Sequence, residues 1–578
     1  MTGRALAVLV MIAATAHAAP HVVETIGATS DVHDVAIAGD DVVLATSGGV
    51  AIVRGERVVQ TLGTADGLPG ARVLSATASD DGVWVGGVDG AALLARDGDR
   101  YRVARTLPLH RVTRVARFAG DTWLATFGGG LYRMADGGAP ARVAIGRDRT
   151  RVSDLLVVGD RLWVATIDDG IVRVRADGRR DDVAGLASEV VWDLEPDGNR
   201  VLAATAGGVD VVPARGRARP LRVVDQLPVR DVRSIARRGA RTWVATFGGG
   251  AWRLAGGRAV ALAAPDGMRD ARVIAVAGAR VIVGGERGAA VAEVAGDQLT
   301  AIVSGGLPSA DVTALASAFG STWIGTFSHG VARLHGGVVD VPREVAAIDP
   351  RVNDLAVADG KLWIATDRGL WWFDGARLGR DAGDGAPGDD HVTALHVDAA
   401  GALWVAGGRS LARRDASGWR SWTGEGLTHL DAVATDAGGH AWAAGLHGVV
   451  ELAPATGEMR VRSAASGELA VDWATAVVAW QGGVVVGTYD AGLSWLAGAR
   501  ARQERLADGW VNPHAMRVAG GTLWIGTLDR GLAIGATGAW TRLRIADQLP
   551  SDDVTALLPA GDRAMWVGTR GGLARLEW

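Results

Sequence analysis

The 578-residue sequence contains no cysteine and a single lysine, Lys361. The absence of cysteine excludes disulfides, a thiol nucleophile, an iron–sulfur cluster and a cysteine-ligated zinc, so packing alone must hold the fold. The charge is nearly balanced, with 60 basic against 64 acidic residues, which excludes the basic footprint of a nucleic-acid-binding protein. Beyond the N-terminal segment no stretch approaches the run of about 20 apolar residues that a bilayer span needs, so we expect no direct membrane insertion.

The N-terminal segment has the three parts of a secretory signal. MTGR carries a positive charge, ALAVLVMIAAT is an apolar run, and Ala16 and Ala18 place small residues before a cleavage site. We therefore predict a signal peptide over 1–18, cleaved after Ala18, and a periplasmic or secreted protein. No cysteine precedes that site, so a lipoprotein anchor is not expected.

A motif of a dozen residues recurs along the chain. Residues 122–133, TWLATFGGGLYR, return as TWVATFGGGAWR at 242–253 and as TWIGTFSHGVAR at 322–333. Aligning the chain on this motif gives fourteen anchor positions, spaced 38 to 43 residues apart, each followed two places later by Ala or Gly. Ten anchors are tryptophan and four are degenerate: Trp84, Trp123, Trp163, Trp243, Trp323, Trp363, Trp404, Trp442, Trp524 and Trp566, with Val43, Leu202, Ile282 and Val485. A period near 40 indicates a propeller, a solenoid or an array.

The content of one repeat selects the propeller. Within 309–340, DVTALAS, STWIGT and VARL are three short strand patterns separated by turns that contain glycine, and a fourth strand leads into the next repeat. No repeat has a helical periodicity long enough for a helix. Four antiparallel strands per repeat predict an all-β fold of propeller blades. We interpret the small residue after each anchor as room for the large ring to lie flat between blades, and the following glycines as tight turns.

Fourteen blades exceed the roughly 4–8 blades of one propeller, so we predict two seven-bladed β-propellers, over 19–296 and 297–578. HVVETIG at 21–27 resembles a fourth strand yet precedes the first anchor, and the last repeat has only three strands. Two ways of closing the rings remain. In the favoured one, 21–27 pairs with the third strand after Ile282 and the second ring begins with 298–303. In the other, 21–27 pairs with the C-terminal blade.

The repeats resemble a known family. LWIATDRGLWWF, TLWIGTLDRGLAI and MWVGTRGGLARL, with lead-ins such as GLPSADVTAL and DQLPSDDVTAL, are similar to the two-component regulator propeller repeat over essentially the whole mature chain. The resemblance implies a paired seven-bladed propeller, as in the extracytoplasmic sensor regions of bacterial hybrid two-component systems, which often respond to carbohydrates. The printed sequence holds no β-sandwich, transmembrane or kinase segment, so a sensing role would require another protein to carry the signal.

The rim that surrounds each channel is the favoured place for a binding site, because loops on a rigid scaffold commonly bind ligands. It is formed by the hairpins between second and third strands together with the connections between blades. In the first ring these hairpins are mostly glycine, apart from Asp168-Asp169 and Glu286-Arg287. In the second ring they carry charged and aromatic residues, and the candidate ligand-binding residues are His329, Asp367, Arg368, Tyr489, Asp490, Trp510, His514, Asp529 and Arg530. Aromatic rings beside Asp, Arg and His suit a sugar.

Three functions follow from these patterns. The favoured one is an exported, non-enzymatic binding or sensing protein that recognises a carbohydrate, another small polar ligand or a partner protein through the rim of the second ring. The first alternative is a polysaccharide-acting hydrolase or lyase, which would need Asp490, Asp529 and Asp367 to converge with His329 or His514. The second is an envelope scaffold that docks a membrane signalling protein through exposed aromatics near Trp371 or Trp419. We assign no catalytic residue, and we expect no cofactor or metal, because the aspartates that begin the first strands read as turn caps.

Overall fold

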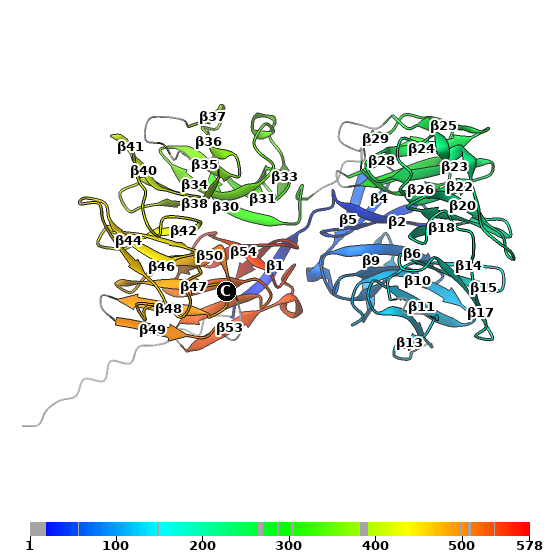
Figure 1. Cartoon of the computed structure of the whole chain (residues 1–578), viewed down its shortest axis with the longest axis horizontal. Coiled ribbons are helices and arrows are strands. Elements are labelled where there is room, and N and C mark those ends of the chain that lie inside the picture. Colours follow the sequence, from blue (N-terminus) through cyan, green and yellow to red (C-terminus); the bar gives the residue numbers. More distant parts are fainter. Residues whose placement is uncertain are drawn as a thin grey trace, which may run out of the picture.

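The computed structural model describes residues 19–578 except for 56, 136, 147–149, 264–269, 286–287, 302–305, 382–385, 387–390, 498–499, 507–509 and 537. These residues form fourteen four-stranded antiparallel sheets (Figure 1). The predicted all-β fold of two seven-bladed propellers is therefore confirmed. The predicted signal peptide over 1–18 and the Glu286-Arg287 pair lie outside the described residues.

Each blade follows the strand order read from the sequence. In the blade around Trp323, the strands are β30 (Val312–Ala318), β31 (Ser321–Thr326), β32 (Val331–His335) and β33 (Val338–Asp340), and each pairs with the next. All fourteen anchors lie in the second strand of their sheets. The helical segments of the described chain are four short 3-10 turns: Thr64–Asp66, Arg222–Gln226, Arg343–Val345 and Ile545–Asp547.

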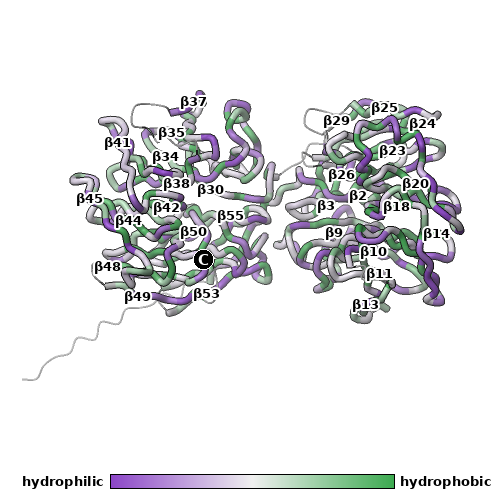
Figure 2. The backbone as a smooth tube through the Cα atoms, in the orientation of Figure 1, coloured by the Kyte–Doolittle hydropathy of each residue, from purple (hydrophilic) through white to green (hydrophobic). Residues whose placement is uncertain are grey.

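Two closed rings are built from the innermost strands, each of which packs against the next. The first ring uses β2 (Val32–Ala38), β6 (Val73–Ser79), β10 (Val112–Phe118), β14 (Val152–Val158), β18 (Val191–Asp197), β22 (Val232–Arg238) and β26 (Ala271–Ala277), and β26 contacts β2. The second uses β30, β34 (Val352–Ala358), β38 (Val392–Val397), β42 (Leu430–Thr435), β46 (Ala474–Trp480), β50 (Val511–Ala519) and β54 (Val554–Pro559), and β54 contacts β30. Figure 2 shows hydrophobic stretches along the strands of both rings, with hydrophilic ones mostly at their periphery.

The favoured scheme for ring closure is wrong, and the alternative is correct. The N-terminal strand β1 (His21–Ile26) pairs with β56 (Gly572–Glu577), so His21 lies opposite Glu577 in the last blade (Figure 1). The blade after Ile282 is completed by its own fourth strand, β29 (Thr300–Ala301), which pairs with β28 (Gly288–Glu293). β29 is only two residues long, and this short pairing is why 298–303 could be mistaken for the start of a new ring. The division at 296 and 297 stays a prediction.

Where the small residue after an anchor is glycine, it makes room for a valine of the neighbouring blade. A Cβ on Gly325 would lie 2.6 Å from Cγ1 of Val352, the first residue of the next innermost strand. Gly284 meets Val32 and Gly568 meets Val312 at the same 2.6 Å distance. The pattern was read correctly, but the contact that requires it is between blades.

Ten of the fourteen anchors are followed three places later by Thr, and this Thr and a later Gly close the predicted hairpin. The hydroxyl of buried Thr326 donates to the carbonyl of Gly330 at 2.9 Å, and Thr166 makes the same bond to Gly170 at 3.0 Å. Both glycines have a φ of +70°, which other residues rarely adopt.

The two rings lie side by side and are connected by two neighbouring segments of chain (Figure 1). Leu307 N donates to Gly27 O at 2.9 Å, and the hydroxyl of Ser30 donates to the carbonyls of Leu307 and Pro308. A further contact joins Thr64 of the first ring to the carbonyl of Gln548 at 2.9 Å. Within the described residues, no helix has the length and apolar character that crossing a membrane requires.

Candidate functional site

The innermost strands of the first ring carry an ion cluster. Arg114 projects from β10 and contacts three aspartates from other innermost strands: Asp154 at 2.6 Å, Asp34 at 2.9 Å and Asp193 at 3.8 Å. The side chain of Arg114 is 22% exposed and that of Asp154 is 3% exposed. Burial raises the pKa of Asp34, and it raises that of Asp193 well above its usual value, with the charge of Asp154 adding to the second effect. Arg114 therefore links four of the seven innermost strands of the first ring through ion pairs.

The second ring has a different polar arrangement around its channel. Its innermost strands carry Thr, Asn or Asp at the second position, and six of these seven side chains donate to the first residue of the next blade: Thr313, Asn353, Thr393, Thr475, Asn512 and Thr555. Thr555 donates to Val312 and so completes the circle. These hydrogen bonds fasten each blade to the next at the rim.

Asp431 is the remaining residue of the seven and interrupts this circle, because a carboxylate cannot donate a hydrogen bond. It instead accepts a hydrogen bond from Nε1 of Trp473, in the next blade, at 3.0 Å. Burial raises the pKa of Asp431, and the nearby side chains of His514, His429 and His391 act against that increase. The one departure from the repeating donor pattern is therefore a half-buried carboxyl beside three histidines.

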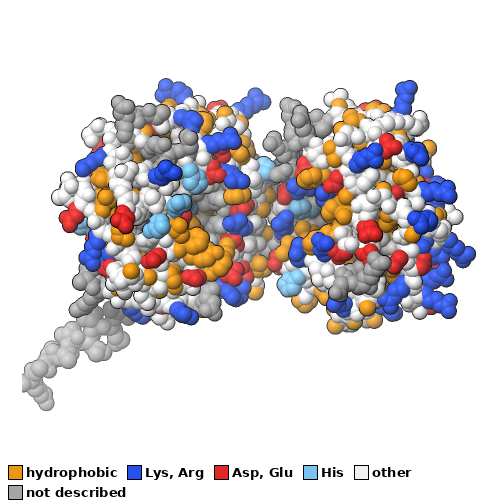
Figure 3. All heavy atoms as spheres, in the orientation of Figure 1, with side chains coloured by type: hydrophobic (Ala, Val, Ile, Leu, Met, Phe, Trp, Pro, Cys, Tyr) orange, Lys and Arg blue, Asp and Glu red, His pale blue; other side chains and the backbone are white. Residues whose placement is uncertain are grey.

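Asp431 lines a concave site at the mouth of the channel, on the predicted rim. We call it the mouth site; its volume is about 220 Å³, and it is lined by Thr313, Asn353, His391, Thr393, Asp431, Asn512, Pro513, His514, Thr555 and Arg570. Figure 3 shows histidine side chains near the middle of the visible face of the second ring. Charged and polar groups surround a hollow in which a small polar molecule can sit.

Asp367 supports the mouth site from outside. Its carboxylate accepts from Nδ2 of Asn353 at 3.0 Å and lies 3.2 Å from Nδ1 of His391 and 3.2 Å from Nη1 of Arg351. Burial acts to raise the pKa of Asp367, but the bonds from Asn353 and Arg351 outweigh it and the pKa is lowered. Asp367 therefore orients two residues of the mouth site.

Three aromatic rings stack beside Asp431. The ring of Tyr489 lies 4.0 Å from that of Trp473 and 4.3 Å from that of Trp510, so both of its faces are covered. Trp473 is 38% exposed. Tyr489 and Trp510 were predicted from the sequence to lie at a binding site; the structure places them together, but it leaves Trp473, not Tyr489, with a large exposed surface. The stack holds the indole that binds Asp431.

His514 reaches the channel because β50 is longer than its counterparts. Between Val511 and Met516, β50 has two more residues than the corresponding part of β34 between Val352 and Leu355. His514 stands in this bulge with a φ of +61°, and its Nδ1 lies 3.3 Å from Oδ2 of Asp354 on β34. Burial acts to raise the pKa of Asp354, yet His514 and the backbone N–H of Leu395 leave it lowered. His514 thus crosses the channel to a blade that is not its neighbour.

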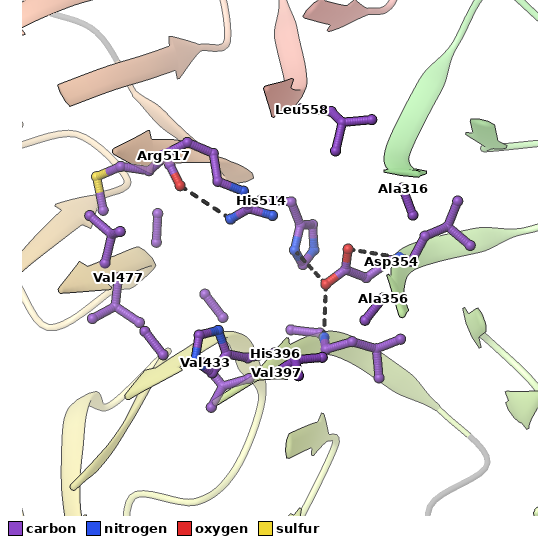
Figure 4. Close-up of a pocket in the computed structure, with 18 of the residues that line it drawn as sticks. Ala316, Asp354, Ala356, His396, Val397, Val433, Val477, His514, Arg517 and Leu558 are labelled. Carbon is purple, nitrogen blue, oxygen red and sulfur yellow. Dashed lines mark hydrogen bonds and ion pairs between the residues drawn. The ribbon is translucent and has the colours of Figure 1, made fainter. Parts of the chain in front are cut away.

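A second cavity, which we call the inner chamber, lies on the other side of His514. Its volume is about 540 Å³, and its walls come from the innermost strands of the second ring, largely Ala, Val and Leu (Figure 4). Its polar side chains include Asp354, His396, His514 and Arg517. His514 lines both cavities, so it forms the partition between them.

The other predicted residues lie away from the mouth site. His329 lines a cavity with Ser30 and Pro308, where the two rings meet. Arg368 is exposed and contacts Asp349 at 3.2 Å, while Asp529 and Arg530 form an exposed pair at 3.7 Å. Asp490 is exposed on its hairpin. Among the described residues no group of His, Asp and Glu is arranged to hold a metal ion.

The aromatic patch suggested for a docking scaffold is largely covered. Trp422 is buried and stacks on Trp404 at 5.6 Å, and Trp419 packs against Trp363 at 6.4 Å. Lys361 lies 4.3 Å from the ring of half-buried Trp372. These residues pack between strands.

The sequence interpretation missed Asp431, Trp473 and Arg517. A signal for Asp431 was present, because aligning the first strands of the second ring shows Thr, Asn, Thr, Asp, Thr, Asn and Thr at one position. Trp473 had no comparable signal, since its role depends on a contact with Asp431 in another blade. Arg517 had none either, because a bulge in its own strand determines its position.

No family model matches the chain, and no curated protein matches it in sequence. Among solved structures, PorZ, a surface component of the type IX secretion system of Porphyromonas gingivalis, is 15% identical, with 96% of this chain and 86% of PorZ covered and a TM-score of 0.70. The extracellular domains of the putative hybrid two-component systems BT4673 and BT3049 of B. thetaiotaomicron are 15% and 14% identical, cover 96% of this chain and 82% and 83% of their own, and have TM-scores of 0.40. PorZ shows a shared fold; the lower TM-scores of the others add nothing to that.

Proposed function

We propose that this chain is an exported, non-enzymatic binding protein that recognises a small polar ligand, a neutral sugar, at the mouth site of the second ring. The observation that carries the proposal is Asp431, the one position where the circle of donors at the rim is replaced by a carboxylate. A structural role alone would favour Thr or Asn there, as in the other six blades.

The surroundings of Asp431 match what a sugar needs. Hydroxyl groups donate to a carboxylate and accept from imidazole and guanidinium groups, which Asp431, His391 and Arg570 supply. The partly exposed indole of Trp473 offers an apolar surface for a ring face. At the channel of the first ring, Arg114 instead pairs with Asp34, Asp154 and Asp193 of the chain itself.

Export is part of the same proposal. It is supported by the signal-like pattern over 1–18. Handing a signal to a membrane partner would then be a separate property of this binding protein.

The test replaces Asp431 with the residue that the repeat itself favours. Asp431→Asn restores a side chain that can donate to Ala474, as Asn353 and Asn512 do in their blades. We expect the variant to melt at the same or a higher temperature than wild type, but to bind its sugar about 10-fold or more weakly. Binding would be measured by calorimetry with maltose, cellobiose, lactose, xylobiose and chitobiose.

Asp490→Asn is the matched control, because Asp490 is exposed on a hairpin of the same ring and lines neither cavity of its channel. It should leave sugar binding unchanged. Absence of binding to all five sugars, or equal binding by wild type and Asp431→Asn, would overturn the proposal.

A further inference from the structure

Arg517 holds an unusual position at the inner chamber. It stands on β50 opposite Trp524, the position that Ala316 and His396 occupy in their own blades. Among the described residues its guanidinium makes one hydrogen bond, from Nη1 to the carbonyl of Met516 at 3.2 Å, and no ion pair. A guanidinium has five N–H donors, so most of its capacity is unused.

The first ring shows how this fold treats a channel arginine that needs no ligand. There Arg114 is surrounded by Asp34, Asp154 and Asp193. In the second ring the chamber that Arg517 lines also holds the carboxylate of Asp354. This carboxylate already accepts hydrogen bonds from the backbone N–H groups of Leu355 and Leu395, both at 2.8 Å, and contacts His514. The positive charge of Arg517 thus has no countercharge in contact.

The opposite wall of the chamber adds a second polar group. Figure 4 shows His396 facing Arg517 and His514 across the cavity. The Nε2 of His396 lies 2.9 Å from the hydroxyl of Thr435. Burial, with the charge of Arg517 adding to it, lowers the pKa of His396 to about 4, so the imidazole is neutral at pH 7. In the tautomer in which the hydroxyl of Thr435 donates to Nε2, the proton of the neutral ring is on Nδ1, and this N–H can donate to a ligand.

The rest of the chamber is apolar. Leu315, Leu355, Leu395, Val433, Val477 and Leu558 line it together with several alanines. A volume of about 540 Å³ lies in the usual range for small-molecule sites. The unused N–H donors of Arg517 lie at a largely apolar wall that also holds the hydrogen-bonded carboxylate of Asp354, and they suit a molecule with one carboxylate and a compact hydrocarbon body.

We propose that the inner chamber binds a small monocarboxylate, with its carboxylate on Arg517 and His396 and its apolar body against the leucine and valine walls. The site is distinct from the mouth site and does not depend on the sugar-binding proposal. Arg517 acts as a bidentate donor here, which is the geometry in which arginine holds carboxylates best.

The test is calorimetric titration of the full chain with butyrate, hexanoate and benzoate, with hexanamide and benzamide as uncharged counterparts. We expect at least one carboxylate to bind, its amide to bind much more weakly or not at all, and Arg517→Gln to weaken carboxylate binding by about 10- to 100-fold. Arg517→Lys keeps the charge but loses the bidentate fork, so it should fall between the two.

Two further variants test whether the carboxylate binds in the inner chamber and whether its binding is independent of the mouth site. Ala356→Leu fills part of the chamber while leaving Arg517 in place, and it should reduce binding of the carboxylate. Asp431→Asn should leave carboxylate binding unchanged whatever it does to sugar binding. The proposal is overturned if none of the three carboxylates binds at concentrations up to about 10 mM, a free energy near −2.7 kcal/mol, or if Arg517→Gln binds them as wild type does.

Discussion

Removing the arginine at the centre of the first ring should destabilise that ring strongly. Arg114→Met keeps an unbranched apolar stem but removes the guanidinium, so it leaves Asp34, Asp154 and Asp193 without their countercharge. Removing one partner of a buried ion pair costs about 3–5 kcal/mol, and because Arg114 retains 22% exposure we expect the lower end, about 3 kcal/mol. A domain of this size loses about 2–3 °C per kcal/mol, so the first ring should melt about 6–9 °C lower.

The loss should depend on pH in a definite direction. Burial already raises the pKa values of Asp34 and Asp193, and without the opposing charge of Arg114 both rise further. The folded state of the variant then holds more protons than the unfolded state at pH values between the unfolded and the folded pKa values of these two groups. Stability of the variant then falls as pH rises through that window. The deficit against wild type should therefore be larger at about pH 7.5 than at about pH 4.5.

Differential scanning calorimetry of wild type, Arg114→Met and Arg517→Met at both pH values makes the comparison. Arg517→Met is the matched control, since it removes a channel arginine that has no carboxylate in contact, and we expect it to change stability by less than about 1 kcal/mol. If Arg114→Met melts within about 2 °C of wild type at both pH values, the aspartates do not need the arginine and the reasoning fails.

Three further predictions concern other parts of the fold. Burial raises the pKa of Glu195 to about 7, with the charge of Asp154 adding to the increase, so the contribution of Glu195 to stability is present in acid and is lost as pH rises through that value. Relative to wild type, Glu195→Gln should therefore gain up to about 2 kcal/mol of stability between about pH 5 and about pH 8. Equal differences in melting temperature between variant and wild type at the two pH values would contradict this. Gly325→Val should cost about 2–3 kcal/mol because its side chain meets Val352, whereas Gly408→Ala, which has no neighbour within 4 Å, should be nearly neutral in a urea titration. Deleting residues 19–27 removes β1 and should lower the melting temperature of the second ring only. The transition of the first ring is identified as the one that Arg114→Met lowers. A lower melting temperature of the first ring in the deletion variant would contradict the observed pairing of β1 with β56.

Most of the fold could be predicted from the sequence of a single repeat. A tryptophan with a small residue two places on, then Thr and Gly, specifies a strand, an interface and a hairpin, and these are local or nearest-neighbour requirements. Repetition at a period near 40 then sets the number of blades. Ring closure could not be derived in the same way, because pairing of β1 with either ring satisfies the same local pattern.

The sequence indicated where the candidate site lies, at the rim of the second ring, but not which residues line it. Charged and aromatic residues at the rim of the second ring indicated where to look, and Tyr489, Trp510 and His514 do lie at or beside the channel mouth. Asp490 and Asp529 share the same pattern but point to solvent, since a hairpin tip can be charged simply because it is a turn. The position of Arg517 at the inner chamber could not be predicted from the sequence, because it depends on a two-residue bulge in β50.

The pairing of β1 with β56 makes the first ring an insertion within the second. The second ring begins with its outermost strand, is interrupted by all of β2 to β29, and is completed only when the other end of the printed sequence arrives. Such a closure has very high contact order, so we expect the first ring to fold early and the second slowly. Until β56 arrives, β1 has no strand to pair with, and in a chain that is exported N-terminus first β1 emerges long before its partner.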